Sequence, residues 1–186
     1  CKAVHLLPII LCKLTEACRA EEEIKSSQCK YVSSASCYLA DGVSFEVRRY
    51  DAAKYAAVSS EGRTFDQVTG ELVRKLLMYI GGSNEQGKLI RITAPIIITV
   101  YPRNDGVLSR RLVVGIRIPT IYQQSPPTPT DSAVRIEERP GMTVYALYVS
   151  CKYVDVYRKQ YFCCSYDPPL KPYGRRNEVW FLQEEP

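Results

Sequence analysis

The chain has 186 residues, of which 46% are hydrophobic, and this is enough for one compact domain with a single core. The formal net charge is +5, but the 25 basic residues are interspersed with 20 acidic ones and form no long run of like charge, which argues against a nucleic-acid partner. Fourteen tyrosines and several Val/Ile-rich runs favour β-structure, because aromatic and branched side chains pack well on a pleated surface.

The first 20 residues have the pattern of a secretory signal. Lys2 precedes an apolar stretch over residues 3–14, and Ala20 is followed by the acidic triplet 21–23. The stretch is much shorter than the ~20 residues that a membrane-spanning helix needs, so we expect no integral membrane segment. We therefore expect a signal-peptide-like segment at 1–20, an N-terminal extension at 21–42 and an extracellular protein. The alternative is a disordered or loosely docked extension.

The cysteines outside this segment are odd in number: Cys29, Cys37, Cys151, Cys163 and Cys164. In an oxidising compartment Cys29 and Cys37 could form a disulfide that closes a short loop, while one of the other three would stay unpaired or pair between molecules. Alternatively, Cys163 is simply a buried strand residue. No pair has CxxC spacing, which argues against a zinc or thioredoxin-type site.

The first half of the chain predicts two strands, a helix and a hairpin. Alternating residues over 44–60 indicate two strands with a bend at 48–52. Thr64 and Gln67 form a capping box, and helical spacing continues to Ile80 before two glycines. Residues 89–101 and 111–118 are typical of a hairpin, since turn-forming residues join them. Residues 119–130 contain four prolines and predict an extended crossover.

The second half parallels the first with an offset of 89 residues, which suggests an internal duplication. It begins with a strand at 134–138, a bend at 139–141 and a strand at 142–149. Closing strands are expected at 157–166 and 178–183. A loop and a helix separate Ser60 from Leu89, whereas Ser150 is followed almost at once by Tyr153 and Tyr157. The second copy of the helix is therefore expected to be missing, which would leave one sheet face uncovered.

Several tracts resemble the SOUL family of haem-binding proteins. The most specific is YDPPLKPYGRRNEVW at 166–180, which is most similar to the porphyrin-binding branch of the family. Residues 45–50, 79–84, 93–96 and 126–131 match as well, so the similarity covers roughly residues 43–183. The resemblance implies a SOUL domain at 43–186 with an α+β fold: a distorted antiparallel β-barrel built from two pseudo-repeats, each with a helix, the second of which is missing here.

The resemblance also implies non-catalytic binding of haem or another porphyrin, by a monomeric tetrapyrrole carrier or scavenger. In the family the ligand lies against the first helix and a loop near the C-terminus. This implies a tetrapyrrole site made of Val73, Arg74, Leu77, Met78, Leu170 and Lys171. A cytoplasmic location, as in the porphyrin-binding branch, is the alternative to secretion.

Physical reasoning agrees in outline, because a porphyrin has two apolar faces and anionic propionates and needs an apolar groove with a cationic rim. The rim cations could be Arg74, Lys75, Lys171, Arg175 and Arg176. Alternatively, the helix residues only extend the core and the cations are solvated. Two positions depart from the family: Arg49 stands where some members have histidine, and Gly70 stands where the porphyrin-binding branch has a basic residue.

The iron of a bound haem would have few candidate ligands. The only histidine is His5, in the signal-like segment, so we expect no metal site and assign no axial ligand; the options are Met78, Met142, a tyrosine or a cysteine. Binding would then be mostly hydrophobic. The lack of a histidine in the rest of the chain also argues against Ser-His or Cys-His catalysis. The competing hypotheses are a protein-interaction or signalling member that has lost ligand binding, and a truncated product with a compromised fold.

Overall fold

The structure, a computed structural model, describes residues 33–38, 44–61, 65–101, 111–148, 160–167, 171 and 173–183, with the backbone alone at 33–38 and 65–69. The signal-like segment, Cys29, the Cys37 side chain and the capping box therefore lie outside the described part of the chain. So do Leu170 and residues 149–159, where a second helix was expected to be missing.

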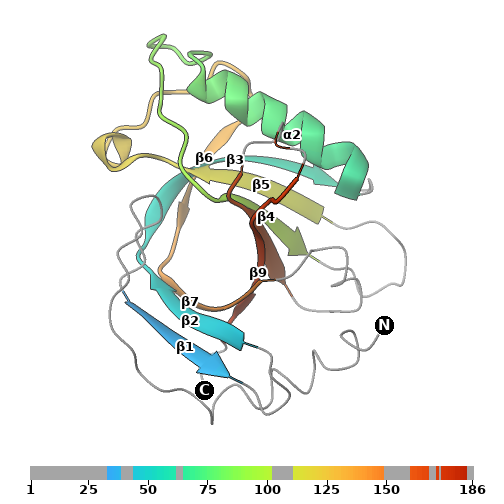
Figure 1. Cartoon of the computed structure of the whole chain (residues 1–186). Helices are drawn as coiled ribbons and strands as arrows, with labels where there is room; N and C mark the ends of the chain where they lie inside the picture. The colour runs from blue at the N-terminus through green and yellow to red at the C-terminus, as the bar shows by residue number, and fades with distance from the viewer. Residues whose placement is uncertain are drawn as a thin grey trace.

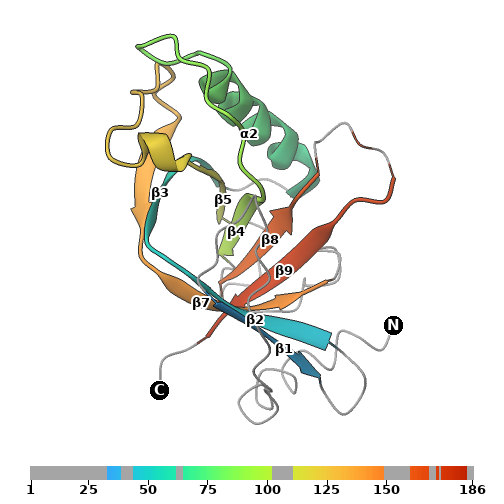
Figure 2. The ribbon, with the colours of Figure 1, turned by 60° about the vertical axis from the view of Figure 1, so that its left-hand side comes forward.

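In the described part of the chain, nine strands form a single antiparallel sheet in the order β1-β2-β7-β9-β8-β4-β5-β3-β6. The sheet curls strongly, and the helix α2 lies across its outside (Figure 1, Figure 2). This agrees with the expected α+β fold with a curved antiparallel sheet. The bounds are β1 Ser33–Tyr38, β2 Ser44–Tyr50, β3 Ala53–Glu61, α2 Phe65–Ile80, β4 Ile96–Tyr101, β5 Arg111–Arg117, β6 Arg135–Arg139, β7 Met142–Leu147, β8 Tyr161–Ser165 and β9 Asn177–Leu182.

Helix α2 forms where the apolar spacing predicted it. Leu72, Leu76, Tyr79 and Ile80 are buried and pack toward β3 and β5. The helix ends at two glycines: Gly81 donates its N–H to the carbonyl of Leu77, and Gly82 has a φ of 111°. Only glycine adopts such a φ without strain, which explains why the helix stops there.

The predicted hairpin is confirmed as β4 and β5, which pair with Ile98 opposite Val114. Its first strand is shorter than expected, because residues 89–95 lie outside any strand. The proline-rich crossover is likewise not extended throughout, since Thr120–Tyr122 form a turn of 3-10 helix. Strand β1 was not expected at all, and it pairs with the edge of β2.

Two bends let the sheet curl. Strand β2 continues into β3 through residues 51–52, at the end of the expected bend at 48–52, and β6 continues into β7 through residues 140–141, within the expected bend at 139–141. The bends lie side by side, because Tyr50 pairs with Met142 and Ala53 with Arg139. A Cβ on Gly141 would come within 3.1 Å of the Tyr50 carbonyl oxygen, so this close approach favours glycine.

Both faces of the curled sheet are apolar. The outer face packs with α2 in one large cluster, which includes Leu76, Val114 and Phe181. The inner face carries a smaller cluster around Tyr50, Phe162 and Trp180. The expectation of an uncovered sheet face is wrong for the described residues, because the outer-face side chains of β2, β7 and β9 are buried: Phe45, Tyr145, Leu147, Val179 and Phe181.

Adjacent cysteines on β8 point to opposite faces, since side chains alternate along a strand. Cys163 belongs to the outer cluster and is disulfide-bonded, whereas Cys164 belongs to the inner cluster and is buried. One interpretation of the sequence was that Cys163 is simply a buried strand residue; it is buried, but it also takes part in a disulfide.

Candidate functional site

The solvent-facing side of α2 carries an apolar surface. Met78 is 53% exposed and Leu77 is 36% exposed, and Arg74 is also exposed. Val73 differs from these, because it is partly buried and packs against the outer core. Of the expected ligand contacts on the helix, three are therefore accessible and one mainly extends the core.

The segment between α2 and β4 adds further exposed apolar side chains, Leu89 at 77% and Ile92 at 47% exposure. Ile92 also lines a cavity of about 200 Å³ that lies between this segment and the end of β8. The cavity has an apolar wall and a polar one: Ile92, Thr93, Ala94, Ile96, Ser165, Tyr166 and Asp167. Neither Leu89 nor Ile92 was expected to contribute to a site.

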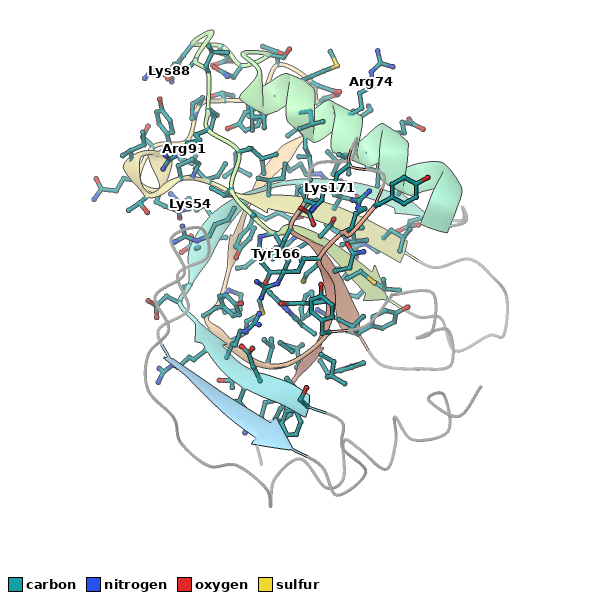
Figure 3. The ribbon with its side chains drawn as sticks, in the orientation of Figure 1. Lys54, Arg74, Lys88, Arg91, Tyr166 and Lys171 are labelled. Carbon is teal, nitrogen blue, oxygen red and sulfur yellow. The ribbon has the colours of Figure 1, made fainter. Side chains whose placement is uncertain are left out.

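The expected rim cations differ in their surroundings. Lys171 donates from Nζ to Oδ1 of Asp167 over 2.8 Å, and Lys75 donates to Asp131 over 3.3 Å. Arg175 donates to the Ser165 hydroxyl over 2.9 Å. Figure 3 shows Arg74 on the outer side of α2 and Lys171 between the helix and Tyr166. Lys171 thus lies in the connection between β8 and β9, between the helix and Tyr166.

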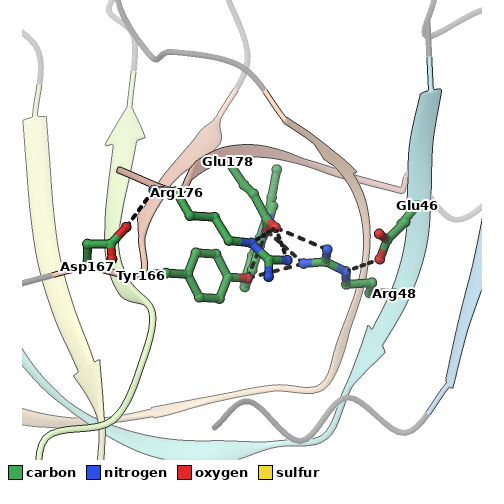
Figure 4. Close-up of polar contacts among 7 residues, drawn as sticks. Glu46, Arg48, Tyr166, Asp167, Arg176 and Glu178 are labelled. Atoms are coloured by element: carbon green, nitrogen blue, oxygen red, sulfur yellow. Dashed lines mark hydrogen bonds and ion pairs between the residues drawn. The ribbon is translucent and has the colours of Figure 1, made fainter. Parts of the chain in front are cut away.

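A buried ion pair crosses the inside of the curled sheet. Arg48 on β2 donates two hydrogen bonds to Glu178 on β9, from Nη1 over 2.7 Å and from Nη2 over 3.1 Å. The exposed fractions of the two side chains are 4% and 3%. Arg48 also donates from Nε to Glu46 over 2.8 Å. The pair therefore joins two strands that are not neighbours in the sheet (Figure 4).

Glu178 accepts hydrogen bonds from three further side chains. The Tyr166 hydroxyl and the Trp180 indole N–H each donate to Oε2 over 2.8 Å. Arg176 donates to Oε1 over 2.8 Å, and its guanidinium lies 4.6 Å from the centre of the Tyr166 ring. A buried carboxylate needs this many donors, because its loss of hydration is otherwise costly. We call this set the inner network: Glu46, Arg48, Tyr166, Arg176, Glu178 and Trp180.

The charges in the inner network stabilise one another. Burial alone would raise the pKa of Glu178, but Arg48, Trp180 and Arg176 outweigh it and lower the pKa to about 2. Burial, with Tyr50 and Glu178 nearby, raises the pKa of the Tyr166 hydroxyl well above its ordinary value. The hydrogen bonds from Lys171 and from the Arg176 backbone lower the pKa of Asp167. The network is thus a carboxylate held ionised beside a neutral tyrosine.

Sequence reasoning missed the inner network, although a signal for it was present. On β2 and β9 the side chains alternate between the two faces, and Arg48 and Glu178 occupy positions that face the same way as Tyr50 and Trp180. A charged residue of each sign at such a position is the pattern of a buried pair.

The described residues contain no group of three or more His, Cys, Asp and Glu side chains placed to hold a metal ion. No helix within the described ranges is long and apolar enough to cross a membrane.

Comparison with protein families and curated proteins gives consistent matches. The family "SOUL heme-binding protein" matches residues 27–151. Heme-binding protein 1 of Xenopus tropicalis is 41% identical over 162 residues, covering 77% of this chain and 85% of its own. That of Bos taurus is 37% identical over 163 residues, covering 76% and 84%. Heme-binding protein 2 of Homo sapiens is 31% identical over 163 residues, covering 76% and 78%.

Among solved structures, the EcmrR C-terminal domain has a similar fold, with a TM-score of 0.56, 9% identity and coverage of 76% of this chain and 97% of its own.

Proposed function

The chain belongs to the SOUL heme-binding protein family, and from this membership we propose that it binds haem or a related porphyrin without acting as an enzyme. The observation that carries the proposal is the set of exposed apolar side chains on α2 and in the segment after it, Leu77, Met78, Leu89 and Ile92. Basic side chains are available from Arg74 on the outer side of α2 and from Lys171 between the helix and Tyr166 (Figure 3). The ligand is a small molecule, and we propose that a single copy of the chain binds it.

The apolar surface suits the flat faces of a tetrapyrrole. Exposed side chains of this size are costly to leave in water, and covering them is favourable by about 25 cal/mol per Å² of apolar area. The 200 Å³ cavity beside Ile92 is too small to enclose a whole porphyrin, so we propose that the ring lies on the surface and that one edge enters the cavity. Val73 supports the site from beneath, and Leu170 remains part of the proposal from sequence.

The basic side chains suit the propionates. Lys171 already holds a carboxylate, that of Asp167, and a propionate would take the same place or share the ammonium group. Arg74 offers a second cation from the exposed side of α2. Such exposed pairs contribute only about 0.2–1 kcal/mol each, so most of the affinity would come from the apolar faces.

The side chains at this surface favour binding of the ring over binding of the iron. Among the described side chains of this surface, Met78 has an atom that could coordinate iron, but a thioether sulfur alone binds iron weakly. We therefore expect hemin and metal-free protoporphyrin IX to bind with similar affinity. Titration of the purified chain with both, followed by absorbance and by quenching of Trp180, tests this. A strong preference for hemin would contradict it.

The site itself is tested by Leu77→Asp combined with Lys171→Glu. A charge against the apolar ring and a reversed charge at the propionate should weaken binding by about tenfold or more, while unfolding stays cooperative. The matched control is Ile121→Asp, because Ile121 is 82% exposed and lies on the 3-10 turn. Loss of binding in the control, or unchanged affinity in the double variant, would move the site elsewhere.

A further inference from the structure

A continuous chain of polar contacts leads from Lys171 to the buried ion pair. Lys171 donates to Asp167, and the other oxygen of Asp167 accepts the backbone N–H of Arg176. The side chain of Arg176 donates to Glu178, and Glu178 accepts two hydrogen bonds from Arg48. Figure 4 shows these contacts from Asp167 across to Arg48. The position of the exposed Lys171 ammonium is thus linked to the buried pair of Arg48 and Glu178 inside the curled sheet.

These contacts hold together the two ends of the β8–β9 connection. We call these ends the neck and define it as Tyr166, Asp167 and Arg176. The two sides of the neck are joined by a backbone hydrogen bond from the Tyr166 N–H to the Arg176 carbonyl over 3.1 Å. They are joined again through Glu178, because the Tyr166 hydroxyl and the Arg176 guanidinium donate to its two oxygens. Rotation of either side chain would break a hydrogen bond to a buried carboxylate.

Burial makes this arrangement stiff. Glu178 has an exposed fraction of 2% and is held from one side by Arg48 and from another by the Trp180 indole. Buried charge pairs that lose one partner are left with an uncompensated charge, so the neck has few alternative positions. By contrast, the outer link between Lys171 and Asp167 is solvent-exposed, with side-chain exposures of 44% and 19%. The series of polar contacts therefore has a rigid end at Glu178 and a solvent-accessible end at Lys171.

We propose that Arg48 and Glu178 are positioning residues for ligand binding, which hold Asp167 and thereby place the Lys171 ammonium where it meets a propionate. The inference rests on the proposed function. It extends that function to two residues that lie inside the curled sheet and are not among the proposed ligand contacts. Their contribution is to hold Lys171 in place beforehand, so that little order is lost when the ligand binds.

The test compares protoporphyrin IX with its dimethyl ester, which lacks the propionate charges. Lys171→Met should reduce affinity for the diacid by up to about fivefold and leave affinity for the ester unchanged. The paired variant Arg48→Met with Glu178→Gln removes both buried charges together, and Gln keeps an acceptor for Trp180, so the fold is preserved. It should show the same selective loss, and the triple variant should lose nothing more.

A merely structural role would give a different result. Equal losses for diacid and ester in the paired variant, or losses that multiply in the triple variant, would overturn the proposal. The control is Lys88→Met, since Lys88 is exposed, lies 5.6 Å from the Tyr122 ring and is far from Lys171 in Figure 3. It should bind both ligands as the wild type does.

A second readout separates this proposal from the proposed function. The N–H groups of Tyr166 and Arg176 are hydrogen-bonded across the neck, so their exchange should be several times faster in the paired variant than in the wild type, without ligand, while exchange in β4 and β5 stays unchanged. Unchanged exchange at these two amides would overturn the positioning role whether or not porphyrins bind. Absence of saturable binding by the wild type would instead overturn the proposed function, and the exchange result would then decide whether the inner network places Lys171.

Discussion

At the residue scale, the negative charge of Glu178 has to be compensated by neighbouring donors, because the side chain is almost completely buried. It is a buried carboxylate whose negative charge is matched by two guanidinium groups, an indole N–H and a phenol. Arg48 and Glu178 come from sequence positions 130 residues apart. Local pattern could indicate that each points inward, but only the curl of the sheet brings them together.

The pH dependence of stability should report on Glu178. Its pKa falls from the usual 4.5 to about 2 on folding, so the charge stabilises the fold above about pH 4.5 and this contribution is lost as the pH falls toward 2. Glu178→Gln should therefore lower the free energy of unfolding by about 2–4 kcal/mol at pH 7 and by much less near pH 2. Urea denaturation of both proteins across this range measures the difference. A difference that does not change with pH would contradict the assignment.

Residue-scale reasoning from sequence was partly sufficient for the proposed ligand surface. The family resemblance assigned Leu77, Met78 and Arg74 to the ligand site, and all three side chains are exposed. Leu89 and Ile92 were assigned to a strand instead, because a run of β-branched residues gives no sign that residues 89–95 leave the sheet.

At the element scale, α2 was the most predictable part of the fold, because apolar spacing and a double-glycine stop agreed with each other. Strand β1 was the least predictable. Its sequence, SSASCY, has little β-propensity, and it is a strand because it pairs with the edge of β2. The tertiary partner, and not the local sequence, decides its structure.

Helix α2 contains one glycine that its surroundings do not require. A Cβ on Gly70 would meet nothing within 4 Å, and the position is exposed. Gly70→Ala should therefore raise the free energy of unfolding by about 0.5–1 kcal/mol, since alanine loses less backbone entropy in a helix. Gly82→Ala is the matched comparison and should be destabilising, because Gly82 has a φ of 111°. Thermal unfolding of the two variants beside the wild type measures both, and a loss of stability in Gly70→Ala would mean that the backbone there is not helical in solution.

At the scale of the whole molecule, one sheet serves two cores. The outer core lies against α2, and the inner core lies within the curl, around Trp180 and the inner network. The bends at 51–52 and 140–141 lie within the ranges that the sequence predicted, but their pairing was not predicted, because it depends on contacts between distant strands. The sequence predicted one uncovered sheet face, yet described side chains on both faces of the sheet are buried.

Sharing one sheet should make the molecule unfold in a single step. Trp180 is the sole tryptophan and is fully buried in the inner core, so its fluorescence reports on that core. Circular dichroism at the helical minimum reports on α2, which packs against the outer core. Because neither core survives loss of the strands between them, the two signals should give the same denaturation midpoint. A helix signal that is lost at lower denaturant than the Trp180 signal would mean that the outer core is separately marginal, as the hypothesis of a truncated product with a compromised fold requires.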